Sequence, residues 1–409
     1  MLGVRQGSAI LVGGAAWNAL TGSVARADVA IRDGGVVAVG DLVAADHAGV
    51  PTIDVAGCIL LPGLIDAHVH LTMDPDALNK TGVGESDVFA TLRAAHAAEA
   101  TLQAGFTTVR DMGGRNHLEM ELRAAIDRDL ARGPRMVCAG KIVSMSCLAA
   151  EQYAGMYAEA DGVDAVIGAV RDQVKRGADV VALIATGTAF EPGADPHQVR
   201  HSLDELTAAV QAAHQTGRRA AVHAEGIEGL RNGLRAGADT IELGTFLYED
   251  ESAARWMADH GVTLVPTMTV FDSFLHAPED VDLGVSRQEV ERLRDANRRS
   301  VQLAATSGVA IACGGNTGMA LQAHGSNARE LQLLSGVGLT AEQVLAAATT
   351  VAASALGSAE RLGRIEPGYV GDVIAVEADS LSEAISGVDT QRLQLVVQAG
   401  IPISGPRAA

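Results

Sequence analysis

The sequence predicts a (β/α)8 barrel joined to a small β-sandwich that both ends of the chain build together. Strand-like apolar runs alternate with amphipathic helix patterns between residues 59 and 358. Short β-type runs with glycine turns precede that region and return after it. The 409 residues are enough for a large barrel and a smaller domain. We therefore expect a composite sandwich from 1–58 and 359–409, and a barrel from 59–358.

Eight apolar runs predict the barrel strands. In order they are "CILLPGLID", "FTTVRD", "RMVCAG", "GADVVALIATG", "RRAAVHAEG", "ADTIELG", "GVTLVPTM" and "GVAIACGGN". Runs that are apolar on both faces are typical of parallel strands covered by helices on the outside. Eight such runs make a closed parallel barrel the simplest architecture.

Helix signals lie between these runs. Val163, Val166 and Val170 fall on one helical face. Ser202 followed three residues later by Glu205 predicts a capping box at a helix start. Thr340 with Gln343 predicts the same device later in the chain, at residues 340–343. The helices thus fall where parallel strands need crossover connections.

Composition narrows the possible partners and location. Asp and Glu number 50 against 31 Lys and Arg, a formal charge of −19, which argues against nucleic acid and anionic membranes. No apolar run reaches the roughly 18–20 residues of a membrane span. Four cysteines lack any pair spacing, so we expect a reducing, cytoplasmic setting. An N-terminal signal peptide is the alternative, but Gly13, Gly14 and Asn18 favour a strand–turn–strand there.

Polar residues gather at the ends of the predicted strands. His68 and His70 lie two apart in "DAHVH", so both imidazoles point to one side of a strand and suggest a metal. Since carboxyl ends of barrel strands meet at one mouth, other polar residues join them there. These are Asp111, His223, Glu225 and Asn316.

Five motifs together resemble the amidohydrolase superfamily. They are "LPGLIDAHVHL", "AGFTTVRDMGG", "AVHAEG", "HGSNARELQLL" and "GRIEPGYVGDVIAVEAD", and they run through almost the whole chain. The sequence is most similar to the imidazolonepropionase-like and Xaa-Pro-dipeptidase-like branch. The resemblance implies a (β/α)8 barrel with a small β-sandwich, and a hydrolase of C–N bonds with one or two metals.

The metal ligands that the resemblance implies are only partly present. His68, His70 and His223 match three family ligands. Ala182 stands where the family has a carboxylated lysine, Leu243 where it has a histidine, and Asn316 where it has an aspartate. Alanine cannot bridge two cations, and a neutral asparagine cannot take a proton from water. We therefore expect no binuclear centre, and either no metal or one divalent ion, with zinc favoured. An introduced substitution would explain Asn316 alone, so three losses favour natural divergence.

Other candidates carry two interpretations each. Asn316 could donate to substrate or be a weak fourth ligand, and Glu225 could be an acid/base or a solvated or arginine-paired carboxylate. Asp111 is a candidate for substrate binding, with an ion pair or a loop anchor as the alternative. Tyr153 could line the mouth or pack, and His324 could contact the ligand or support its loop.

Three functions follow from this site. The first is an enzyme that acts on a small amide, lactam or carbonyl compound by acid/base chemistry, with His68, His70, His223, Glu225 and Asn316 as catalytic candidates. Cyclisation, dehydration, isomerisation or elimination would fit, as in natural-product tailoring. The second is a mononuclear C–N hydrolase with a metal on the three histidines. The third is a non-catalytic binding protein. A homodimer is implied by the resemblance alone.

Overall fold

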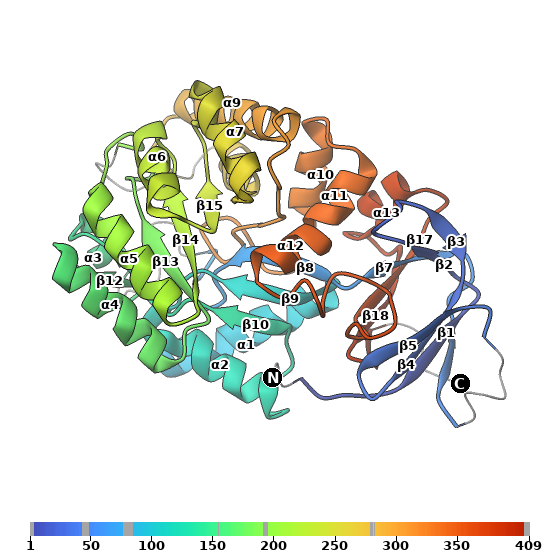
Figure 1. Ribbon diagram of the computed structural model, residues 1–409. Coiled ribbons are helices and arrows are strands. Elements are labelled where there is room, and N and C mark those ends of the chain that lie inside the picture. The colour runs from blue at the N-terminus through green and yellow to red at the C-terminus, as the bar shows by residue number, and fades with distance from the viewer. Residues whose placement is uncertain are drawn as a thin grey trace.

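Parallel strands form the centre of the molecule and helices surround them (Figure 1). The computed structural model describes residues 4–42, 49–76, 85–153, 155–190, 195–278, 281 and 283–404. The barrel strands are β8 (Leu64–Val69), β9 (Phe106–Asp111), β10 (Arg135–Cys138), β13 (Val180–Ile184), β14 (Arg219–Ala224), β15 (Thr240–Leu243) and β16 (Thr263–Val265). Neighbours in the order β8–β9–β10 and β13–β14–β15–β16 pair in parallel. The predicted (β/α)8 barrel with a sandwich is confirmed.

The eighth predicted strand, "GVAIACGGN", is not a regular strand. It makes only a bridge between Ile311 and Leu264. The amide of Ala312 donates to the carbonyl of Leu264 at 2.9 Å, and the amide of Ala67 donates to the carbonyl of Cys313 at 2.8 Å. This extended segment therefore closes the ring between β16 and β8. Gly314 lets this segment pass close to β8, because a Cβ at this position would lie 2.9 Å from the Cβ of His68.

The first predicted strand, "CILLPGLID", is two strands. β7 (Cys58–Pro62) pairs antiparallel with β17 (Val373–Glu377), and only β8 enters the barrel. Gly63 lies between the two strands, and only glycine fits there, because a Cβ would lie 2.2 Å from Oγ1 of Thr107. The apolar run continues through both strands because each is buried, so hydrophobicity alone does not reveal the break.

Both ends of the chain build the β-sandwich, where blue and red segments lie side by side in Figure 1. One sheet has the order β5–β4–β1–β6 and the other β19–β18–β17–β7–β2–β3. Their remaining strands are β1 (Ala9–Val12), β2 (Ala15–Trp17), β3 (Val24–Arg26), β4 (Asp28–Arg32), β5 (Gly35–Gly40), β6 (Thr52–Asp54), β18 (Leu393–Gln398) and β19 (Ile401–Ser404). The domain boundaries 1–58, 59–358 and 359–409 stay a prediction.

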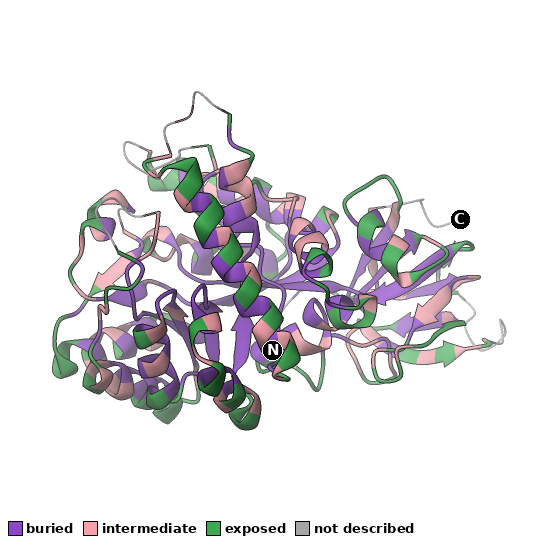
Figure 2. Cartoon of the chain, turned by 90° about the horizontal axis from the view of Figure 1, so that it is seen from above, coloured by how far each residue is buried: buried purple, intermediate pink, exposed green. Residues whose placement is uncertain are grey.

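Helices cover the outside of the barrel, with buried faces turned inward and exposed faces outward (Figure 2). They are α1 (Asp87–Gln103), α2 (Leu118–Asp127), α3 (Leu148–Gln152), α4 (Val163–Arg176), α5 (Leu203–Gln215), α6 (Ile227–Ala236), α7 (Glu251–His260), α8 (Thr269–Leu275), α9 (Arg287–Thr306), α10 (Arg329–Gly336), α11 (Ala341–Ala347), α12 (Thr350–Ala355) and α13 (Leu381–Gly387). Two short strands, β11 (Ile142–Ser144) and β12 (Tyr157–Glu159), extend the sheet beside β13. The capping boxes at Ser202 and Thr340 are both present.

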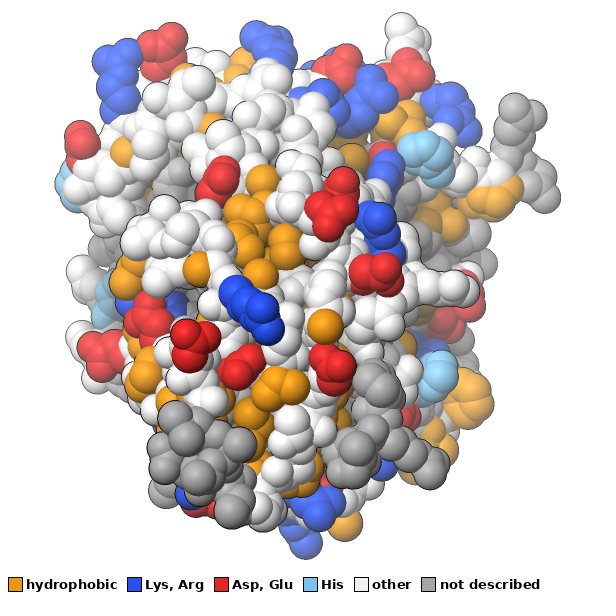
Figure 3. Space-filling model, turned by 90° about the vertical axis from the view of Figure 1, so that its right-hand side faces the viewer, with side chains coloured by type: hydrophobic (Ala, Val, Ile, Leu, Met, Phe, Trp, Pro, Cys, Tyr) orange, Lys and Arg blue, Asp and Glu red, His pale blue; other side chains and the backbone are white. Residues whose placement is uncertain are grey.

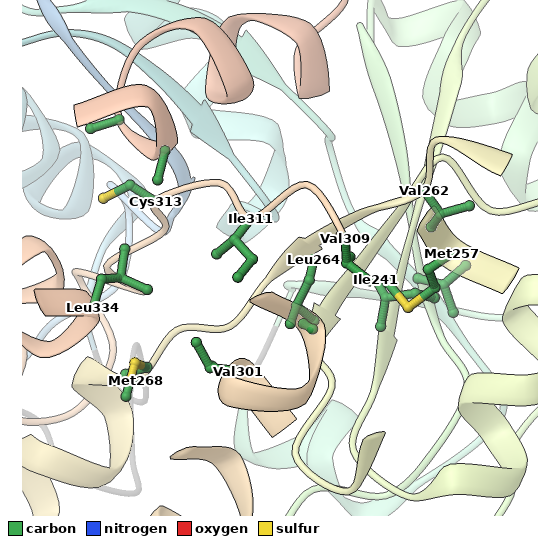
Figure 4. Close-up of a cluster of buried hydrophobic side chains, with 14 of the residues drawn as sticks. Ile241, Met257, Val262, Leu264, Met268, Val301, Val309, Ile311, Cys313 and Leu334 are labelled. Atoms are coloured by element: carbon green, nitrogen blue, oxygen red, sulfur yellow. The ribbon is translucent and has the colours of Figure 1, made fainter. Parts of the chain in front are cut away.

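Apolar side chains fill the space between strands and helices. Figure 4 shows Leu264 of β16 and Ile311 of the closing segment in one cluster with Val301 of α9 and Met257 of α7. These side chains are fully or almost fully buried. Burial of one such side chain stabilises the fold by about 1.5–3 kcal/mol. This packing fixes the strand ends that carry the polar residues.

One face of the molecule carries charges of both signs. Figure 3, which views the molecule from the right-hand side of Figure 1, shows acidic and basic side chains interspersed on that face. No helix in the described part of the chain is both long and apolar enough to cross a membrane.

Candidate active site

His68 is held by a buried carboxylate. It comes from β8, and its Nδ1 lies 2.8 Å from Oε2 of Glu242 on β15. Glu242 is fully buried and His68 is 4% exposed. An imidazole nitrogen beside a carboxylate carries the proton, so Nδ1 donates to Glu242. The lone pair of the other nitrogen, Nε2, is then available to a ligand.

Arg110 keeps Glu242 ionised. Its Nη2 donates to Oε1 of Glu242 at 2.6 Å, its Nη1 donates to Oγ1 of Thr240 at 3.1 Å, and its Nε donates to the carbonyl of Ala67 at 2.6 Å. Burial alone would raise the pKa of Glu242, but the Arg110 guanidinium and the His68 hydrogen bond lower that pKa to about 2. The chain Arg110–Glu242–His68 is therefore a fixed ion pair that orients an imidazole.

His70 is oriented by the backbone. Its Nδ1 lies 2.9 Å from the carbonyl oxygen of Gly113 and donates to it, which also leaves Nε2 unprotonated. The rings of His68 and His70 meet edge to face with centroids 5.3 Å apart. Burial, followed by repulsion from His68, lowers the pKa of His70 to about 3. This imidazole is neutral at physiological pH.

His223 and Asn316 present atoms without partners. His223 is the last residue but one of β14, and Asn316 is the last residue of the closing segment. Neither Nε2 of His223 nor Oδ1 of Asn316 has a hydrogen-bond partner, although both atoms are buried. Burial, with His68 and Arg200 nearby, lowers the pKa of His223 to about 3. An unpaired buried polar atom costs about 1–3 kcal/mol, so a bound ligand that pairs both atoms would recover that free energy.

Leu243 and Asn316 hold unusual backbone conformations. Leu243 has φ of 66° and Asn316 has φ of 49°, in the left-handed region. Asparagine tolerates this region, whereas a leucine there is strained. Both side chains line the same cavity as Ala182. The three positions where the resemblance implies lost ligands are thus all at the cavity.

The cavity is largely apolar. His68, His70, His223, Glu242 and Asn316 lie at its polar part. Its apolar walls come from several elements and include Met112, Ile142, Tyr153, Met156, Tyr157, Phe190, Val270, Phe274 and Met319. A concave apolar pocket with a few convergent polar groups is typical of a small-molecule site.

The residues fit a metal only in part. Each of His68 and His70 donates through Nδ1 and keeps Nε2 free, the arrangement that metal-bound histidines also use. However, no group of three or more His, Cys, Asp and Glu side chains within the described ranges is arranged to hold a metal ion. One divalent ion on His68, His70 and His223, with zinc favoured, therefore stays a prediction.

Three predicted site residues do not line the cavity. Asp111 accepts hydrogen bonds from the amides of Leu71 and Gly113, which corresponds to the loop-anchor alternative, because Arg110 pairs with Glu242 instead. Asp111 is not among the residues that line the cavity, and its predicted contact with a ligand stays a prediction.

Glu225 and His324 are the other two predicted site residues that do not line the cavity. Glu225 is fully buried and accepts from the amide of Ala189 and from Oγ1 of Thr245, so the expectation of a solvated carboxylate is wrong. His324 lies 3.3 Å from the carbonyl oxygen of His70, which corresponds to the loop-support alternative. Tyr153 does line the cavity.

Glu242, Arg110 and Asp66 were missed as site residues. Asp66 accepts from the amides of His68 and Gly315 and so fixes β8 to the closing segment. A charge inside an apolar strand run signals all three, because a buried charge requires a partner across the barrel. Thr240 and Glu242 lie two apart in "TIEL" and share a face, which could have revealed this position.

Barrel, sandwich and histidine-bearing mouth together define an amidohydrolase. A model of the amidohydrolase family matches residues 59–400, and the chain belongs to that family. It is an enzyme of the amidohydrolase superfamily, which sets aside the non-catalytic alternative. Members of the family usually depend on metals.

Individual relatives support the same branch. The chain is 28% identical to ochratoxinase of Aspergillus niger over 374 residues, 85% of this chain and 76% of that protein. It is 26% identical to imidazolonepropionase of Erwinia tasmaniensis over 351 residues, 78% of this chain and 79% of that protein. A crystal structure of a Xaa-Pro dipeptidase with bound methionine matches with a TM-score of 0.88 and 26% identity, over 97% of this chain and 100% of that one.

Proposed function

We propose that this enzyme carries out proton-transfer chemistry on a small amide, lactam or other carbonyl compound. The observation that carries the proposal is the Arg110–Glu242–His68 chain, which holds one imidazole nitrogen on a carboxylate and leaves the other as a base at the cavity. A positioned base of this kind contributes typically about 10²–10⁴-fold to a rate. Isomerisation, elimination, dehydration and cyclisation fit, as in the tailoring of a natural product.

Each residue has a distinct task in this proposal. Nε2 of His68 takes a proton from the substrate and returns it to another atom, or releases it with the leaving group. The Glu242 carboxylate stabilises the imidazolium that forms in between. The amide of Asn316 pairs with the substrate, and the neutral imidazoles of His70 and His223 contribute hydrogen bonds rather than charge.

A mononuclear C–N hydrolase is the second candidate. The free Nε2 atoms of His68 and His70 favour it, because both could bind one divalent ion such as zinc. Ochratoxinase and the Xaa-Pro dipeptidase are relatives whose names denote hydrolysis. The two candidates differ in metal content and in the mass of the product.

The test combines metal content with product mass. Protein purified without added metal or chelator is analysed for elements and incubated with a panel of neutral amides and lactams, followed by mass spectrometry. We expect well under about 0.1 equivalent of metal and products of unchanged mass or lacking one water. His68→Gln should abolish turnover, and the exposed His260→Gln is the matched control. About one equivalent of zinc with products that gain water would establish the hydrolase instead.

The setting of the enzyme is part of the proposal. A small molecule is the expected partner, and the acidic composition disfavours nucleic acid and anionic membranes. A cytoplasmic location and a homodimer are also proposed.

A further inference from the structure

We propose that the cavity selects an uncharged ligand that has an apolar, ring-sized body and an amide-like polar end. This inference rests on the proposed function only in placing the ligand beside His68. It specifies the class of substrate, which neither the family nor the catalytic chain determines.

Among the described residues that line the cavity, no charge is free to pair with a charged ligand. Glu242 is the only Asp, Glu, Lys or Arg of that described lining, and its two oxygens are occupied by Arg110, Thr240 and His68. A ligand carboxylate or ammonium would therefore lose its hydration without gaining a countercharge.

Arg200 is the cation whose charge acts on His223. It is not in the cavity lining, and its Nη1 lies 3.6 Å from Sγ of Cys147 and donates to it. Its positive charge favours anions in the cavity slightly, but its side chain offers them no hydrogen bond there because Arg200 is not in the lining. The comparison of an anion with a neutral ligand is thus the decisive one.

The two unpartnered atoms specify the polar end. Oδ1 of Asn316 can only accept, so the ligand must bring an N–H or O–H group to it. Nε2 of His223 either accepts or, in its protonated tautomer, donates to a carbonyl. An amide or lactam edge offers an N–H donor and a C=O acceptor side by side and can pair both atoms at once.

The aromatic wall specifies the body of the ligand. The rings of Phe190 and Phe274 pack with centroids 4.1 Å apart and planes tilted by 38°. Tyr153 and Met156 belong to the lining as well. The cavity has a volume of about 90 Å³. Aromatic walls around a narrow space favour a flat ring over a long polar chain.

Three fragments of nearly the same shape test the inference. The full chain is titrated near neutral pH with benzamide, benzoate and benzylamine by calorimetry. These share a phenyl ring and differ in charge. We expect benzamide to bind at least about tenfold more tightly than either charged fragment. Equal or tighter binding of benzoate or benzylamine would overturn the inference, and so would no binding of all three.

Variants locate the binding and reverse its preference. Phe274→Ala should weaken benzamide binding at least about fivefold, and Leu148→Ala, which changes a side chain that is 70% exposed, is the matched control. Asn316→Asp places a carboxylate at the acceptor position, so benzylamine should gain about tenfold and benzamide should lose affinity. If Phe274→Ala does not fold, the Asn316→Asp variant still tests the inference. An unchanged preference for benzamide over benzylamine in that variant would contradict it.

Binding requires no turnover, so the two proposals can fail separately. A preference for the neutral fragment without any proton transfer would reject the proposed function and leave this inference standing. Proton transfer on charged substrates only would support the proposed function and reject this inference.

Discussion

Two sets of residues at the barrel mouth differ in their hydrogen bonding, and we call them its completed side and its open side. In the completed side, His68 and His70 each have one nitrogen on a defined acceptor, and Arg110 pairs with Glu242. The open side consists of an alanine, an apolar leucine and the two unpartnered polar atoms, contributed by Ala182, Leu243, His223 and Asn316. The two sets are neighbours, because Leu243 follows Glu242 on β15 and the amide of Asn316 donates to the carbonyl of His68 at 2.7 Å.

The completed side orients the catalytic imidazole of His68, and the open side recognises the ligand. A network whose members are all paired is rigid, which suits a base that must meet a proton at one position. The open side gains its missing hydrogen bonds only when a ligand binds. Variants of each side should therefore affect different observables.

Completing the open side should give the largest change. Leu243→His combined with Asn316→Asp supplies two donors beside imidazoles that already leave Nε2 free, and both residue types tolerate the left-handed backbone at these positions. We expect zinc content to rise from under about 0.1 to about one equivalent per chain. Elemental analysis after dialysis measures it. Alanine at both positions is the control, and equal zinc in both variants would contradict the prediction.

Breaking the completed side should cost the most stability. Glu242→Gln leaves the buried Arg110 without its countercharge and keeps one acceptor oxygen where Arg110 and His68 now use two. Loss of one partner of a buried pair destabilises by about 3–5 kcal/mol. Denaturant titration measures the free energy of unfolding. Glu251→Gln, in an exposed pair with Arg255, should cost about 0.5 kcal/mol or less, and similar losses in the two variants would argue against the network.

The neutral imidazole of His70 makes stability depend on pH. Its pKa is about 3 in the folded protein against 6.5 for an ordinary histidine, so only the unfolded chain binds this proton between those values. The unfolding free energy should fall as pH decreases from about 6.5 to about 3, by up to about 1.4 kcal/mol per pH unit. His70→Gln should have a flatter profile over that window. Parallel profiles would show that the pKa of His70 is the same in the folded and unfolded chains.

Removal of the His324 side chain, which contacts the backbone of His70, should have the smallest effect on stability and ligand affinity. His324 bridges the carbonyl of His70 and Oγ1 of Thr101, outside the cavity lining. His324→Leu should destabilise by about 1 kcal/mol and leave benzamide affinity within about twofold. A double-mutant cycle with Thr101→Val measures the coupling. A large loss of affinity would instead support the predicted ligand contact.

Sequence and structure agree best where a local pattern decides the outcome. The capping boxes at Ser202 and Thr340 and the alternation of strands and helices follow from contacts within a few residues. The break at Gly63 and the irregular eighth segment were not predicted, because buried strands in different sheets share one apolar signature. Sequence placed His68, His70, His223 and Asn316 at one mouth, since parallel strand ends converge.

By itself the sequence determined the barrel, the sandwich and the residues at the strand ends, because periodicity and strand order are properties of the chain. Only the tertiary structure decided which partner each residue has. Arg110 and Glu242 are 132 positions apart, and their pairing depends on how β9 and β15 face each other across the barrel. Asp111, adjacent to Arg110, points instead to the amides of the loop. Burial raises the cost of every unpaired charge, so the enclosed interior, rather than proximity in sequence, selected these partners.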